Sequence, residues 1–272
     1  MQTSSRRVVF VKAVVVTAVL FAALSVRDLA LMVGVKIPGL PMSSYAGSSM
    51  DNLLAVVFAL LALLCLRSRD ERTSVPRLLG LGAPGWKAPV CVLVATLPFW
   101  VGCAVTGKLQ TTIDWRDILF TALLFPLAEE LVFRGFGFIF TRRALGWRMA
   151  PAVLVQALVF GWVHWVGMKD SELAMQVFAI TFLGGIVFAV LDAMNGYTLW
   201  CGLVFHVSLN AAWDVFDVAP SAATGWLGNG LRVLSAALAI GLVWLVSRRS
   251  RGVSMQGWDD GAVPARTSRS GR

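Results

Sequence analysis

Residues 124–136 read LFPLAEELVFRGF and place three ionisable side chains, Glu129, Glu130 and Arg134, in an otherwise apolar stretch. On insertion scales, each such side chain costs about 2.5–3.5 kcal/mol at the centre of a membrane-spanning helix. Ionisable residues retained in such a place mark a functional site by default. The stretch therefore predicts a membrane-embedded helix that carries chemistry.

The rest of the chain is equally apolar. Of its 272 residues, 57% are hydrophobic and 14% are charged, whereas a soluble domain carries about 25% charged residues. Long apolar runs separated by short polar segments are typical of transmembrane helices. We therefore expect an all-α, polytopic integral membrane protein with a single domain over residues 1–246 and a disordered basic tail over 247–272. The predicted spans are 8–26, 53–66, 88–105, 118–140, 150–166, 174–191, 198–216 and 231–246.

The basic residues that give the net charge of +9 fall mainly in alternate loops between the predicted spans. With the N-terminus inside, 16 basic residues fall in inside segments and six in outside segments. This bias is the positive-inside pattern, so we expect cytoplasmic termini, a bilayer environment and no nucleic-acid partner. The expected location is the cytoplasmic membrane of a bacterium. One exception is the predicted inside loop after Leu191, which carries Asp192 and no basic residue.

The two glutamates receive different expected roles from helical geometry. Glu130 and Arg134 lie four residues apart with the acid first, which is the favourable order for an ion pair. Glu129 points about 100° away from Glu130 in an α-helix and is therefore freer to act on a substrate. The two carboxyls can also titrate as a coupled pair.

The chain has two histidines, and both are predicted to lie within spans. His164 follows Phe160 by one helical turn, and His206 precedes Asn210 by one turn, so each pair shares a helix face. Taken singly, a buried histidine is more often a packing residue, and the Glu130–Arg134 pair could serve only helix packing. Placed together on three spans, these polar groups favour a functional site.

These groups suit hydrolysis. A carboxylate held away from bulk water can act as a general base near neutral pH, so Glu129 can take a proton from water. His164 can orient that water or share its proton, while His206 and the Asn210 amide can donate hydrogen bonds to an oxyanion. A divalent metal such as zinc stays open as an alternative, because Glu129, His164 and His206 form a common catalytic zinc ligand set.

The motifs resemble the CAAX protease and bacteriocin-processing family of intramembrane proteases, also called the CPBP or Abi family. The family motifs Glu-Glu-x-x-x-Arg, Phe-x-x-x-His and His-x-x-x-Asn stand here in that order at 129–134, 160–164 and 206–210. The likeness covers about 117–213 and implies an eight-helix, glutamate-dependent endopeptidase with Glu129 as the base. It also implies an oxyanion site at His206 and Asn210, with Glu130, Arg134 and Phe160 at or supporting the site.

The implied substrate is a membrane-anchored or lipidated polypeptide, and nothing in the sequence decides whether it is prenylated. Residues 192–198 depart from the basic, Thr-Gly-containing turn that family members often carry before the last motif. The competing hypotheses are a non-catalytic membrane scaffold and a proton-coupled carrier that use the same polar cluster. A carrier would be expected to show repeat symmetry, and the polar residues here concentrate after Glu129.

Overall fold

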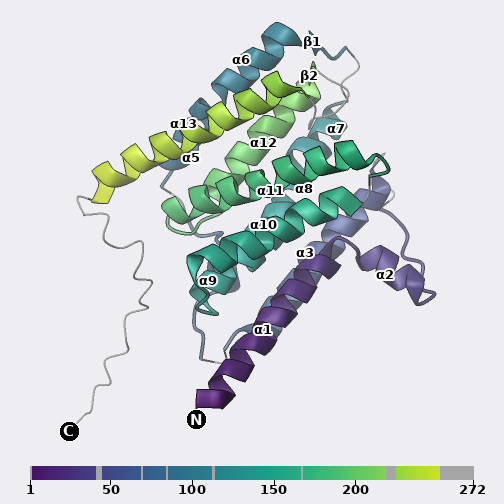
Figure 1. Ribbon diagram of the computed structural model, residues 1–272, viewed down its shortest axis with the longest axis vertical. Coiled ribbons are helices and arrows are strands. Elements are labelled where there is room, and N and C mark those ends of the chain that lie inside the picture. Colours follow the sequence, from purple (N-terminus) through teal and green to yellow (C-terminus); the bar gives the residue numbers. More distant parts are fainter. Residues whose placement is uncertain are drawn as a thin grey trace.

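The computed structural model of the chain describes residues 2–40, 45–68, 70–83, 85–111, 114–166, 168–218 and 225–251. Helices run side by side in alternating directions and make up almost all of the described chain (Figure 1). The protein is a polytopic all-α membrane protein, as the composition predicted. The elements in chain order are α1 (Gln2–Ala23), α2 (Val26–Met32), α3 (Ala46–Leu66), α4 (Val75–Leu78), α5 (Lys87–Ala95), α6 (Leu97–Thr106), β1 (Lys108–Leu109), α7 (Trp115–Ile118), η1 (Leu119–Leu124), α8 (Phe125–Glu129), η2 (Glu130–Phe140), α9 (Thr141–Arg143), α10 (Met149–Val166), α11 (Ser171–Met194), α12 (Trp200–Val215), β2 (Phe216–Asp217) and α13 (Trp226–Arg251).

Each predicted span corresponds to a helical segment, although not all have the length and composition of a simple span. In the described residues, five helices are long and apolar enough to cross a membrane: α3, α5 joined with α6, α10, α11 and α13. Helices α1 and α2 make a sixth candidate, bent by 88° at the break between them. The two remaining predicted spans, 118–140 and 198–216, differ from these. The run from α7 to α9 changes helix type and carries charges, and α12 has only 16 residues.

The loops gather at two opposite ends of the bundle (Figure 1). At one end, the Leu199 amide donates to the Gly80 carbonyl (3.0 Å), and the Trp200 indole donates to the Gly82 carbonyl (2.7 Å). At the other end, β1 pairs antiparallel with β2. The loop before α5 and the turn before α12, both predicted to be cytoplasmic, therefore lie together at one end of the molecule.

The segment from α7 to α9 is the centre of the bundle. It is continuous from Trp115 to Arg143, with π-helical stretches at η1 and η2. Nearly all of η2 is buried, because Val132, Phe133 and Phe136 pack against apolar side chains of α1, α3 and α10. This packing fixes the helix that carries the three charged residues.

Helix ends are set by local chemistry. The Asp170 carboxylate accepts hydrogen bonds from the amides of Glu172 (2.9 Å) and Leu173 (3.1 Å) and so caps α11. Helices α10 and α11 approach closely because Gly185 has no side chain. A Cβ atom at this position would lie only 3.1 Å from the Cα of Ala157. At the far end of the chain, α13 continues to Arg251, past the predicted start of the tail at residue 247. The rest of the predicted tail, 252–272, lies outside the described residues.

Candidate active site

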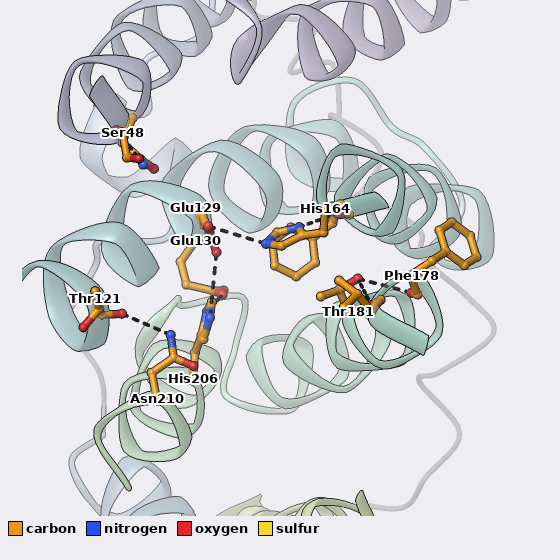
Figure 2. Close-up of polar contacts among 12 residues, drawn as sticks. Ser48, Thr121, Glu129, Glu130, His164, Phe178, Thr181, His206 and Asn210 are labelled. Atoms are coloured by element: carbon orange, nitrogen blue, oxygen red, sulfur yellow. Dashed lines mark hydrogen bonds and ion pairs between the residues drawn. The ribbon is translucent and has the colours of Figure 1, made fainter. Parts of the chain in front are cut away.

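The predicted site residues come from three helical segments and meet in the bundle. Glu129 ends α8 and Glu130 begins η2, His164 lies near the end of α10, and α12 carries both His206 and Asn210. Figure 2 shows the side chains of Glu129, Glu130, His164 and His206 pointing toward one another. Residues up to 77 positions apart in the sequence thus form one cluster.

Glu129 stands between the two imidazoles. One carboxylate oxygen lies 3.8 Å from Nε2 of His164, and the other lies 3.8 Å from Nε2 of His206. These side chains are mostly buried yet retain some exposure, 16% for Glu129 and 30% for His164. All three line a cavity of about 390 Å³, whose other walls are largely apolar side chains of α11, α12 and α13. A base in this place can meet both water and an apolar substrate.

The His164 ring is oriented by its own helix. Its Nδ1 lies 2.8 Å from the carbonyl oxygen of Phe160, one turn earlier. A carbonyl oxygen only accepts, so Nδ1 is the protonated nitrogen. In the neutral ring, Nε2 is then an acceptor facing Glu129.

Glu130 does more than pair with Arg134. One of its oxygens lies 3.3 Å from Nε of Arg134, and the other lies 2.9 Å from Nδ1 of His206. Glu130 and Arg134 are both fully buried. The helical spacing predicted the contact with Arg134 but not the one with His206, because a contact between residues 76 positions apart depends on the tertiary fold. Glu130 therefore orients the second histidine.

Two aromatic rings cover the buried cation. The guanidinium carbon of Arg134 lies 4.3 Å from the Phe160 ring centroid and 4.7 Å from that of Phe188. Phe188 also stacks on the His206 ring at 4.9 Å. These π faces attract a desolvated cation and replace part of its hydration. The sequence singled out Phe160 but not Phe188, since a phenylalanine in an apolar helix carries no signal of its own.

Asn210 is held by a backbone carbonyl of another helix. Its Nδ2 donates to the carbonyl oxygen of Thr121 in η1 (3.1 Å), as Figure 2 shows. Asn210, Thr121 and Asp214 all line the cavity. An amide has two N–H groups, so one N–H of Asn210 stays available to a ligand. Thr121 and Asp214 were not among the predicted site residues.

Asp192 corrects one expectation. It was assigned to an inside loop after Leu191, but α11 continues to Met194 and the Asp192 side chain is fully buried. Its Oδ1 accepts the amide of Gly202 in the first turn of α12 (2.8 Å), which supplies the cap that Leu199 cannot provide. The Asp192 carboxylate also interacts electrostatically with Glu130 and Arg134. Asp192 therefore secures the start of the helix that carries His206.

The metal alternative can be tested against the donor arrangement. A zinc ion bound by Glu129, His164 and His206 would need all three donors at about 2.0–2.2 Å from one point. Within the part of the chain that the structure describes, no three His, Cys, Asp or Glu side chains are arranged to hold a metal ion. The hydrolysis that we propose is therefore assigned to the protein's own side chains.

The model of the family described as Type II CAAX prenyl endopeptidase Rce1-like matches residues 111–212, a range that contains all three motifs. The match confirms the resemblance to the CAAX protease family. No curated protein matches the chain.

Proposed function

From the match of residues 111–212 to the Rce1-like CAAX prenyl endopeptidase family, we propose that this integral membrane protein is a glutamate-dependent intramembrane endopeptidase. Its substrate would be a membrane-anchored or lipidated polypeptide. The single observation that carries the proposal is the Glu129 carboxylate, which faces Nε2 of His164 and of His206 on the wall of the cavity.

Glu129 is the proposed base. A distance of 3.8 Å is longer than a direct hydrogen bond, and a water can bridge polar groups at such a separation. Glu129 takes a proton from this water while Nε2 of His164 accepts the second hydrogen bond and orients it. The water oxygen then attacks the scissile carbonyl, and the proton passes from Glu129 to the leaving amine nitrogen.

His206 and Asn210 are the proposed oxyanion donors. With Nδ1 held at the Glu130 carboxylate, the His206 ring donates a hydrogen bond from Nε2 when both ring nitrogens carry a proton. The free N–H of Asn210 is the second donor. Glu130 therefore supports catalysis by orienting the imidazole rather than by touching the substrate.

The test compares membrane-protein termini in cells that express the wild-type protein or the Glu129→Gln variant. The purified proteins are then assayed on a quenched fluorescent peptide in which S-farnesyl-cysteine precedes three residues. We expect Glu129→Gln to lower kcat on the order of 10²–10⁴-fold. Glu172→Gln, which changes an exposed glutamate in the first turn of α11, is the matched control and should leave kcat unchanged. The proposal would be ruled out if cells expressing Glu129→Gln showed the same set of new protein termini as cells expressing the wild-type protein.

Three alternatives are distinguished by further measurements on the same proteins. Loss of cleavage on treatment with 1,10-phenanthroline, restored by added zinc, would establish a metal-dependent route through Glu129, His164 and His206. Capture of a partner that survives Glu129→Gln without any cleavage would favour a scaffold. Substrate-dependent proton flux in liposomes would favour a carrier.

A further inference from the structure

The Asn210 amide is bound to an unusual acceptor. Backbone carbonyls inside a helix are normally satisfied by N–H groups four or five residues later in the same helix. The Thr121 carbonyl lies within a continuous helical run, yet it accepts a hydrogen bond from a side chain of α12. The helical donor that this carbonyl would have must therefore be identified.

The helix register and one proline explain this. In η1 the hydrogen bonds are π-type, and the Phe125 amide donates to Phe120, five residues earlier. In that register the donor for Thr121 would be residue 126, which is a proline and has no N–H. The α-type donor, Phe125, is already used. Pro126 therefore leaves the Thr121 carbonyl to accept from elsewhere.

Thr121 also contacts Asp214, which lies one helical turn after Asn210 in α12. Its hydroxyl lies at hydrogen-bonding distance from the Asp117 carbonyl (2.7 Å) and from the carboxylate of Asp214. Asp214 follows Asn210 by four residues, so both side chains lie on the same face of α12. Residue Thr121 thus joins η1 to α12 at two successive turns, both beside the cavity.

We propose that Pro126 is a positioning residue for the reaction. By withholding an N–H from the π-helical register, it reserves the Thr121 carbonyl for Asn210. One N–H of the Asn210 amide is thereby fixed, and the other is held ready for the oxyanion. This inference rests on the proposed function only in the role it gives to Asn210.

The first experiment measures cleavage of the farnesylated peptide by the full-length protein. Pro126→Ala supplies an N–H that competes for the Thr121 carbonyl, so kcat should fall toward that of Asn210→Ala while KM changes little. Removing one oxyanion donor costs on the order of 10²–10³-fold in kcat. In the Asn210→Ala background, Pro126→Ala should cause no further loss. A multiplicative loss in the double variant would contradict the proposal.

The control is Pro151→Ala. Pro151 lies in the exposed first turn of α10, where N–H groups have no helical acceptor. Its replacement should leave kcat unchanged in both backgrounds.

A second experiment needs no catalysis and uses the thermal unfolding of the same variants in detergent. In the Asn210→Ala protein, the Thr121 carbonyl has lost its partner. Adding Pro126→Ala should then raise Tm, because the new N–H satisfies that carbonyl. Adding it to the wild type should raise Tm less or lower it, since there it displaces Asn210.

Equal Tm shifts in the two backgrounds would overturn the positioning role. If the shifts differ as expected but Asn210→Ala cleaves at the wild-type rate, the proposed oxyanion role fails and the hydrogen-bond arrangement stands. The two proposals are thus separable.

Discussion

Helices α10 and α12 each bring one histidine to the site, but they hold it in different ways. In α10, His164 is oriented by the Phe160 carbonyl one turn earlier in the same helix. In α12, His206 is held by Glu130 from η2 and by the Phe188 ring from α11. The start of α12 is capped by Asp192 from α11. The first histidine depends on local geometry, and the second depends on tertiary contacts.

The difference has a chemical consequence. Nδ1 of His164 donates to a carbonyl and its Nε2 faces Glu129, which suits the proposed orienting of a water. Nδ1 of His206 faces the Glu130 carboxylate, which fixes the ring with Nε2 on the Glu129 side and suits the proposed donation to an oxyanion. We therefore propose two roles for the same side chain, set by its two different neighbours.

The largest expected effect follows from removing the Glu130 carboxylate, which contacts His206 of α12. Glu130→Ala leaves the buried Arg134 charge without its anion, and breaking a buried pair in this way costs about 3–5 kcal/mol. Chemical unfolding of the detergent-solubilised protein measures this loss. Glu129→Ala is the control, since the Glu129 carboxylate faces His164 and His206 whereas Arg134 pairs with Glu130, and its loss should cost far less. Equal losses for the two glutamates would remove the distinction between them.

A smaller effect is expected at the start of α12. Asp192→Ala removes the acceptor for the Gly202 amide, and loss of a helix cap costs about 0.5–2 kcal/mol. Because the capped helix carries His206, kcat should fall as well. Asp170→Ala removes a comparable cap from α11 and should lower Tm without lowering kcat. If both variants keep full kcat, Asp192 has no part in placing His206.

The smallest effect concerns the ring shared by Arg134 and His206. Phe188→Leu keeps an apolar side chain, though a smaller one, and removes the π face from both groups, which is worth about 0.5–1.5 kcal/mol. Phe178→Leu, which removes a stacked ring that contacts Phe182 away from both groups, is the comparison. Tm of the two variants is measured together with kcat, and only Phe188→Leu should lower kcat. An unchanged kcat would show that stacking does not orient the imidazole.

Much of this arrangement was predictable from the sequence. Apolar runs located the long helical segments but not the short helices α2 and α4. The i, i+4 spacing placed Glu130 with Arg134 and Phe160 with His164. These signals are local: they need only the periodicity of a regular helix and the cost of charge in lipid. They were enough to select Glu129, His164, His206 and Asn210 on the cavity wall, but not Thr121 or Asp214.

The remaining contacts have no local signal. Apolar periodicity did not predict the π-helical register of η1 and η2, because it does not separate π-helical from α-helical turns over such short stretches. Asp192 was misplaced because a charge near a predicted helix end is usually in a loop, whereas here it is buried as a cap. The contact of Glu130 with His206 joins residues 76 positions apart, and their proximity depends on the tertiary fold.

The central claim is that Glu129 and both imidazoles surround one water. The most direct measurement is an experimental structure of the wild-type protein in lipid at a resolution that shows ordered solvent. The account predicts a water within about 3.2 Å of the Glu129 carboxylate and of Nε2 of His164. Packed aliphatic side chains or lipid between that carboxylate and both rings would contradict it.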